Sequence, residues 1–262
     1  DERLGGAANV ARNAASVGAQ ISILGVVGDD ESGKIVERLL QEQGVKSYLQ
    51  RDPSLKTTVK LRVVARQQQL IRLDFEKAPT NEALLNKLEQ FQSLLKEVDA
   101  VVFSDYGKGG LTHVTQMIAA AKAAGKFVLV DPKGDDYSKY QLASMITPNR
   151  AELRQVVGRW KDEADLTQKA QALRETLKLD ALLLTRSEEG MSLFTAKGVE
   201  HVKAQAREVF DVSGAGDTVI ATMAVALAAG WAPGKAMTLA NKAGGIVVGK
   251  LGTATVSLEE LQ

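Results

Sequence analysis

The sequence predicts an α/β fold built around a mainly parallel sheet. Short apolar runs alternate with helical patterns along most of the 262 residues, which is typical of βαβ units. A chain of this length that is 45% hydrophobic is long enough to bury one large core. We therefore expect one main domain over residues 1–262.

Strands are expected where apolar runs are too short for helices, at residues 21–27, 100–103, 127–130, 145–146 and 181–184. Helical periodicity fills the intervals, and Gly44 and Gly125 end two of the helices. The expected helices cover residues 31–43, 82–97, 113–124, 165–178, 219–229 and 236–248.

Residues 57–76 break this rhythm, because apolar and charged residues alternate there with period two. The pattern predicts an antiparallel hairpin with one wet face, set apart from the parallel sheet. Two interpretations stay open, a solvated edge hairpin and a lid whose basic face covers a phosphorylated substrate. The apolar face needs a partner, in its own domain or in a second subunit. The cations of the hairpin are Lys60, Arg62, Arg66 and Arg72.

Composition excludes several classes of protein. With 33 basic and 32 acidic residues, the net charge is +1, so no global field attracts nucleic acid or an anionic membrane. The chain has no cysteine, which removes disulfides and thiolate chemistry and fits a reducing, cytoplasmic compartment. No apolar run approaches the roughly 18 to 20 residues of a membrane span. We expect neither a nucleic-acid partner nor a membrane partner.

The most informative stretch is DVSGAGDT at residues 211–218, which a long run of small residues follows. Glycines on both sides of Ala215 let the backbone turn tightly and point successive N–H groups at one spot. Such an anion hole beside Asp217 suits phosphoryl transfer, in which the carboxylate takes the proton of the attacking hydroxyl. A bare GxGD is more often a helix-capping turn, so the longer pattern carries the argument.

That longer pattern resembles the DTxGAGD signature of the PfkB/ribokinase family. The block GGAANVA at residues 5–11 and the block GVVGDD at 25–30 resemble the amino-terminal sugar-binding signature of the same family. The resemblance implies a ribokinase-like three-layer α/β/α fold with a mainly parallel central sheet and a small β lid. It also implies a carbohydrate kinase that uses ATP and Mg²⁺.

By this resemblance, the anion hole consists of Gly214, Ala215 and Gly216, Asp217 is the catalytic base, and Asp211 lies near the metal and phosphates. Asn149 and Glu152 match the NxxE motif of the family, whose carboxylate helps to place Mg²⁺ through water. Without the family, the same two residues predict a helix capping box. Both interpretations are compatible.

Residues 184–190 lie where the family has a TxGxxG element that lines the nucleotide. Thr185 and Gly190 are retained, but Ser187 replaces the first glycine, which puts the detailed nucleotide contacts in doubt. Asn241 matches a family position beside the adenine; alternatively, it is a polar residue on a helix flank.

Longer blocks at residues 60–63, 68–76, 104–109, 131–134 and 249–253 resemble the kinases of heptose 7-phosphate within this family. This implies phosphorylation of D-glycero-β-D-manno-heptose 7-phosphate at the C1 hydroxyl, in lipopolysaccharide core synthesis. A phosphorylated sugar needs fixed cations, and loops after parallel strands form pockets. The expected substrate-binding residues are Gly5, Gly6, Asn9, Lys60, Arg62, Arg72, Asp105, Lys108 and Lys133.

Other readings stay open: another sugar or nucleoside kinase of the family, or a nucleotide or sugar sensor without catalysis. No GxGxxG follows the first strand, which disfavours a dehydrogenase. We also expect a homodimer through the hairpin. The resemblance further implies a strand upstream of Asp1 and, in bifunctional members, a nucleotidyltransferase domain after the kinase.

Overall fold

The structure is a computed structural model that describes residues 2–65, 68–205 and 209–262. Arg66, one of the expected hairpin cations, lies outside the described residues. The strands are β1 (Ser22–Gly28), β2 (Lys46–Asp52), β3 (Val59–Ala65), β4 (Gln68–Phe75), β5 (Ala100–Ser104), β6 (Phe127–Asp131), β7 (Met145–Ile146), β8 (Ala181–Thr185), β9 (Met191–Thr195) and β10 (Gly198–Val202). The helices are α1 (Ala7–Ser16), α2 (Glu31–Glu42), α3 (Asn81–Leu94), α4 (Val114–Ala123), α5 (Arg150–Val157), α6 (Glu163–Thr176), α7 (Ala215–Ala228), α8 (Pro233–Val247) and α9 (Leu258–Leu261).

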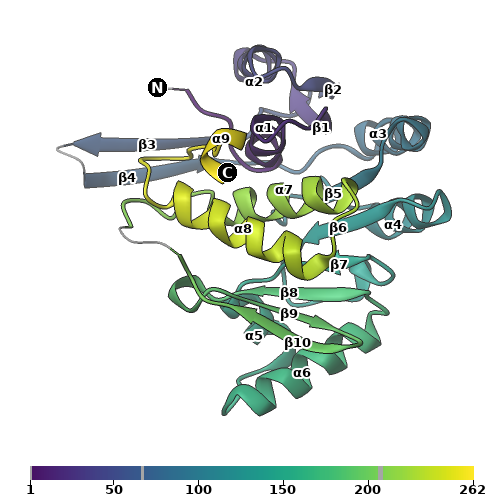
Figure 1. Cartoon of the computed structure of the whole chain (residues 1–262). Coiled ribbons are helices and arrows are strands. Elements are labelled where there is room, and N and C mark those ends of the chain that lie inside the picture. Colours follow the sequence, from purple (N-terminus) through teal and green to yellow (C-terminus); the bar gives the residue numbers. More distant parts are fainter. Residues whose placement is uncertain (1, 66–67, 206–208) are drawn as a thin grey trace.

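The largest sheet has the strand order β10-β9-β8-β7-β6-β5. Strands β5 to β8 pair in parallel, whereas β9 and β10 are antiparallel additions at one edge. β1 and β2 form a separate parallel pair, and β3 and β4 form an antiparallel hairpin (Figure 1). Because β5 and β6 are parallel and in register, Ser104 and Asp131 end side by side at the same edge.

Helices cover both faces of this sheet, which confirms the predicted three-layer α/β/α fold. Along β6, Val128 and Val130 join the hydrophobic core under α4, whereas Leu129 between them joins the core under α7 and α8. In β8, Leu182 joins the first of these cores and Leu183 joins the second. Alternate side chains of a strand point to opposite faces, so apolar residues at every position require a cover on each side.

Helix α7 is buried on nearly every side between α1 and α8 (Figure 1). Its sequence AGDTVIATMAVALA is rich in small residues, which lets neighbouring helices approach closely. At Gly244 of α8, an added Cβ would lie 3.2 Å from the Val219 side chain of α7. α7 also packs against α1, so the start of α7 lies beside α1.

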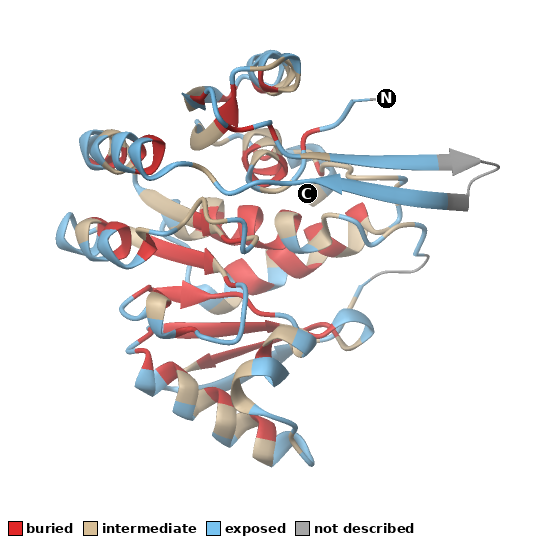
Figure 2. Cartoon of the chain, turned by 180° about the vertical axis from the view of Figure 1, so that it is seen from behind, coloured by how far each residue is buried: buried red, intermediate tan, exposed pale blue. Residues whose placement is uncertain are grey.

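The predicted hairpin is confirmed, with Val59 opposite Phe75, Leu61 opposite Leu73 and a bulge between Val63 and Val64. It projects from the body of the chain, and its described residues are largely exposed (Figure 2). On the apolar face, Leu61 is 47%, Leu73 42% and Phe75 54% exposed. The rest of the described chain therefore leaves this face uncovered.

The sequence did not predict α1, β2, β9 or β10. Helix α1 carries buried Asn9 and Asn13 on its inner face, which disguises its periodicity. The predicted start of α7 at residue 219 was wrong, because the helix begins at Ala215, immediately after Gly214 in the left-handed region at φ 80°. Among the described residues, no helix combines the length and apolarity needed to cross a bilayer.

Candidate active site

Asp217 lies in the first turn of α7, where helix N–H groups have no partner within the helix. The turn before it depends on Gly214, because a Cβ at that position would lie 2.7 Å from the Nδ2 atom of Asn9. The missing side chain lets α1 and α7 meet at this point. The start of α7 therefore combines a carboxylate with the positive end of a helix dipole.

Both carboxylate oxygens of Asp217 accept a hydrogen bond. Asn9 Nδ2 donates to Oδ2 at 2.7 Å, and the Tyr106 hydroxyl donates to Oδ1 at 2.9 Å. Burial raises the pKa of Asp217 above its ordinary value, although these hydrogen bonds and the charge of Lys60 act against it. A carboxylate with a raised pKa and a fixed orientation suits a general base.

The amide of Asn9 is itself held in place. Arg12 donates to Asn9 Oδ1 at 3.1 Å, and Asn13 donates to the Asn9 carbonyl at 2.9 Å. Thr218 Oγ1 donates to Asn13 Oδ1 at 2.8 Å, which ties α7 back to α1. Arg12 also donates to the Thr253 carbonyl. This buried network gives Asn9 one orientation, with its amino group toward Asp217.

Two further aspartates lie at the ends of β5 and β6: Asp105 follows β5, and Asp131 is the last residue of β6. Burial would raise the pKa of Asp105, but hydrogen bonds from Tyr140 at 2.6 Å, Lys139 at 2.9 Å and the Gly107 amide outweigh it and lower the pKa. Asp131 shows the opposite balance, because burial and repulsion by Glu152 and Asp217 raise its pKa to about 8. At neutral pH, Asp131 is therefore largely protonated, whereas Asp105 is ionised and compensated by its donors.

The predicted capping box at the start of α5 is confirmed. Asn149 Oδ1 accepts from the amides of Ala151 and Glu152 at 2.9 and 3.0 Å, and Glu152 Oε2 accepts from the Asn149 amide at 3.0 Å. Lys133 Nζ contacts Glu152 Oε1 at 3.0 Å. The structure thus brings Lys133, expected at the substrate, against the expected metal-positioning carboxylate.

The segment expected to line the nucleotide, from Thr185 to Gly190, forms a tight turn between β8 and β9. Ser187 has φ 53°, in the left-handed region that favours glycine. Gly190 has φ 92°, and a Cβ there would lie 2.0 Å from the Val202 carbonyl oxygen. Asn241 of α8 donates to the neighbouring Lys203 carbonyl at 2.8 Å, beside the same turn.

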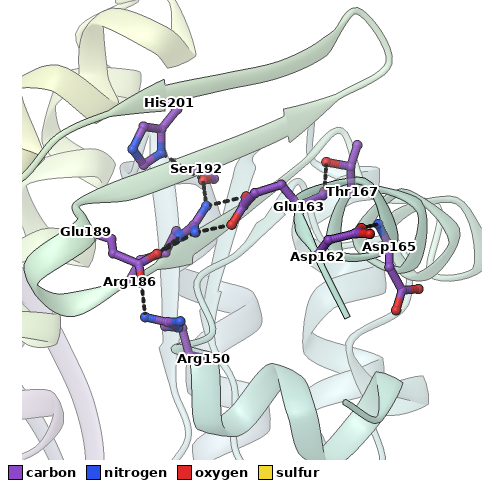
Figure 3. Close-up of polar contacts among 9 residues, drawn as sticks. All are labelled: Arg150, Asp162, Glu163, Asp165, Thr167, Arg186, Glu189, Ser192 and His201. Atoms are coloured by element: carbon purple, nitrogen blue, oxygen red, sulfur yellow. Dashed lines mark hydrogen bonds and ion pairs between the residues drawn. The ribbon is translucent and has the colours of Figure 1, made fainter. Parts of the chain in front are cut away.

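A network of charged side chains that the sequence did not reveal holds this turn (Figure 3). Buried Arg186 donates to both carboxylate oxygens of Glu163, at 2.8 and 2.5 Å, and to Glu189 at 3.1 Å. Glu189 also accepts from Arg150 at 2.6 Å. Ser192 Oγ accepts a further bond from Arg186 at 3.1 Å. Because α5, α6 and β9 all contribute, the turn is anchored from three elements.

The cations of the hairpin act on the same region. The charge of Lys60 opposes the rise in the pKa of Asp217 that burial causes. The pKa of Asp211 is lowered mainly by hydrogen bonds from Ser213, and the charge of Arg62 lowers it further. The basic side of the hairpin therefore lies toward the start of α7. Arg72 pairs with Asp74 at 3.0 Å, and Lys108 contacts Glu76.

Gly6, just before α1, contacts Tyr106, the second donor to Asp217. Gly6 has φ 56°, and a Cβ there would lie 3.3 Å from the Tyr106 ring. Gly5 is exposed, and a Cβ there would meet nothing within 4 Å. Tyr106 lies in the block 104–109, but no motif assigned it a role.

Two backbone donors fix Asp211, before the start of α7. It accepts from the Ser213 amide at 2.8 Å and the Gly252 amide at 3.1 Å.

The profile of the pfkB family of carbohydrate kinases matches residues 2–261, nearly the entire sequence. The chain belongs to this family. Relatives of this pfkB kinase include D-beta-D-heptose 7-phosphate kinase of Bordetella bronchiseptica, which is 55% identical over 100% of this chain and 83% of its own length. Bifunctional protein HldE of Methylococcus capsulatus is 51% identical, over 100% of this chain and 55% of its own length. The chain thus spans little more than half of that bifunctional relative.

Solved structures agree with the fold of this pfkB kinase. Phosphofructokinase-2 of Escherichia coli, in complex with potassium, has a TM-score of 0.85 at 22% identity, over 99% of this chain and 86% of its own. Ribokinase of Arabidopsis thaliana, complexed with ribose and ATP, has a TM-score of 0.78 at 20% identity, over 97% and 84% of the two chains. At this identity, the likeness concerns the fold alone.

Replacing Ser187 by glycine should stabilise the pfkB kinase by roughly 0.5 to 1 kcal/mol. A left-handed conformation costs a residue with a Cβ about 1 to 2 kcal/mol, and the greater chain entropy of glycine offsets part of this gain. Thermal unfolding would measure the difference. The matched control, Glu188→Gly in the same turn, should not stabilise the protein because φ of Glu188 is not positive. A Ser187→Gly protein no more stable than the parent would contradict the expectation.

Proposed function

We propose that this chain is an ATP-dependent kinase that phosphorylates D-glycero-β-D-manno-heptose 7-phosphate at the C1 hydroxyl, giving the 1,7-bisphosphate for ADP-heptose and lipopolysaccharide core synthesis. The observation that carries the chemistry is the buried Asp217 carboxylate, held by two donors at the start of α7. The sugar is taken from the relative of 55% identity that is named as a heptose 7-phosphate kinase.

In the proposed reaction, the C1 hydroxyl lies against Asp217, which accepts its proton as the oxygen attacks the γ-phosphorus in line. The bond between the γ-phosphorus and the bridging oxygen breaks, and ADP leaves. The amides of Gly214 and Gly216 donate to the phosphoryl oxygens on which charge develops. The Ala215 amide, which donates to the Val212 carbonyl at 3.2 Å, would have to share or leave that bond to join them. No covalent enzyme intermediate is required.

The charges around Asp131 fit a bound cation. Burial and repulsion by Glu152 and Asp217 raise the pKa of Asp131 to about 8, and a nearby cation would relieve this repulsion. Both Glu152 oxygens already accept one hydrogen bond, yet each keeps a lone pair for a metal-bound water. We assign Mg²⁺ to this edge, held by Glu152 through water, where it would neutralise phosphate charge.

We place the nucleotide between the start of α7 and the turn at residues 185–190. Thr185, Ser187, Gly190, Asn241 and Asp211 are the proposed nucleotide-side residues. Two observations support this choice: the turn is fixed by the Arg186 network, and Asn241 bonds the strand beside it. The anchoring gives the binding surface a defined shape before the ligand arrives.

The 7-phosphate is assigned to the basic side of the hairpin. Arg62 and Arg72 lie directly opposite each other across β3 and β4. Like charges in this position repel, and an anion between them would remove the penalty. Lys60, Lys108 and Lys133 are further proposed cations, Asp105 a proposed acceptor for a sugar hydroxyl, and Gly5, Gly6 and Asn9 the proposed sugar-side backbone.

The activity test uses the full-length protein with MgATP and a panel of heptose 7-phosphate, fructose 6-phosphate, ribose and adenosine. We expect selective formation of the heptose 1,7-bisphosphate. Asp217→Asn should lower kcat by about 10² to 10⁴ with nucleotide binding retained, because only the proton acceptor is lost. Preference for another sugar would refute the proposed substrate, and substantial turnover by Asp217→Asn would refute the proposed base.

Removing the paired charges, by Arg62→Ala and Arg72→Ala, should raise KM for the sugar phosphate about ten-fold or more each, since a charge-assisted hydrogen bond is lost. Steady-state kinetics at fixed MgATP would measure it. Exposed Lys56 precedes the hairpin, so Lys56→Ala serves as the matched control. An unchanged apparent affinity in both arginine variants would remove the 7-phosphate from the hairpin.

We further propose that two chains associate through the apolar face of the hairpin, where Leu61, Leu73 and Phe75 are exposed. Light scattering at micromolar concentration should give twice the 28.0 kDa of one chain. Phe75→Glu should return the mass to one chain, whereas Leu85→Glu, at an exposed position of α3, should leave it doubled. A single-chain mass for the unmodified protein would contradict the dimer.

A cytoplasmic location and a fused nucleotidyltransferase domain stay predictions.

A further inference from the structure

The second donor to Asp217 is a residue of the loop after β5 to which no motif assigned a role. Tyr106 follows β5, and its hydroxyl donates to Asp217 Oδ1 at 2.9 Å across a sequence separation of 111 residues. Asn9 of α1 donates to the other oxygen, Oδ2, at 2.7 Å. Each oxygen is thus fixed by a different part of the chain, and rotation of the carboxylate would break both bonds.

The position of Tyr106 is set by a contact of its ring and by its neighbour in the chain. The ring lies against the backbone of Gly6, where a Cβ would be only 3.3 Å away. The preceding residue, Asp105, accepts hydrogen bonds from Tyr140 at 2.6 Å, Lys139 at 2.9 Å and the Gly107 amide at 2.8 Å, which fix the backbone before Tyr106. The hydroxyl therefore reaches Asp217 from a fixed support, independently of any sugar.

The protonation states of the pair are complementary. Burial and the neighbouring charge of Asp217 raise the pKa of Tyr106 well above its ordinary value, so the hydroxyl stays a donor throughout the working range. Its hydrogen bond favours the ionised form of Asp217, against the burial that raises the pKa of that carboxyl. Lys60 also favours the ionised form of Asp217. Asp131 belongs to the same site, but burial and the charges of Glu152 and Asp217 raise its pKa to about 8, so it is largely protonated near neutral pH.

We propose that Tyr106 is a positioning residue of the kinase, which holds the Asp217 carboxylate ionised and oriented toward the acceptor hydroxyl. This inference rests on the proposed role of Asp217 as the base. A carboxylate oxygen has two lone pairs, so the acceptor hydroxyl can bind Oδ1 or Oδ2 while Tyr106 and Asn9 remain in place. Tyr106 acts through Asp217 and needs no contact with the transferred phosphoryl group.

The test compares Tyr106→Phe with the parent protein. Phenylalanine keeps the ring against Gly6 and removes only the hydroxyl. The matched control is Tyr48→Phe, which removes a hydroxyl from β2; among the described residues, that hydroxyl makes no hydrogen bond to Asp217. Turnover and KM would be measured from about pH 5 to 9, the range in which a carboxyl of raised pKa titrates. In parallel, the ¹³Cγ resonance of Asp217, assigned with Asp217→Asn, would be titrated.

Because the base must be ionised, turnover falls as the pH drops through the pKa of Asp217. Loss of the Tyr106 hydroxyl raises that pKa, so the acidic limb of the profile should move up by about one pH unit. The ¹³Cγ titration should move by the same amount. At neutral pH we expect kcat to fall about ten-fold, with KM for ATP within about two-fold of the parent. Tyr48→Phe should match the parent.

An unmoved acidic limb together with an unmoved ¹³Cγ titration would overturn the proposal, whatever happens to kcat, because a merely structural role predicts that pattern. If the parent protein phosphorylates none of the sugars, the proposed function fails by itself. The ¹³Cγ titration needs no turnover, so it still decides whether Tyr106 sets the ionisation of Asp217.

Discussion

The close contact between α1 and the start of α7 is the constraint on which the candidate site depends. Gly214 has no side chain, and any Cβ there would collide with Asn9. Because the two helices meet at this point, a buried amide reaches the carboxylate of Asp217 at 2.7 Å. Asn13 donates to the Asn9 carbonyl and accepts from the Thr218 hydroxyl, and these bonds hold α1 against α7. A carboxylate held in this way has little further freedom to lose when a ligand binds.

The site also concentrates negative charge where charge must later be neutralised. Asp131 lies at the carboxyl edge of the central sheet, where its burial and the charges of Glu152 and Asp217 raise its pKa to about 8. Burial of several carboxylates is costly in a protein interior unless cations or hydrogen bonds compensate. Lys133 supplies part of that compensation through Glu152. A cation bound beside these groups would favour the ionised form of Asp131.

The hairpin combines two surfaces with different roles. Its basic side acts on Asp211 and Asp217, whereas its apolar side is left uncovered by the described chain. A two-stranded hairpin has no core of its own, so it can neither cover its apolar side nor neutralise its charged side by itself. This division explains why one short element carries both the proposed phosphate contacts and the proposed subunit contact.

The sequence alone determined the strands of the parallel sheet, the hairpin, the capping box at Asn149 and the family, because these depend on local periodicity and contiguous motifs. It did not determine α1, whose buried asparagines disguise its period, or the edge strands β9 and β10, whose pairing is decided by neighbours. The roles of Tyr106 and of the Arg186 network were not predicted for a related reason: their hydrogen-bond partners are distant in the sequence or lie on separate elements. Only the tertiary structure brings together groups 111 residues apart, because long-range contacts leave no local signal in the order of residues.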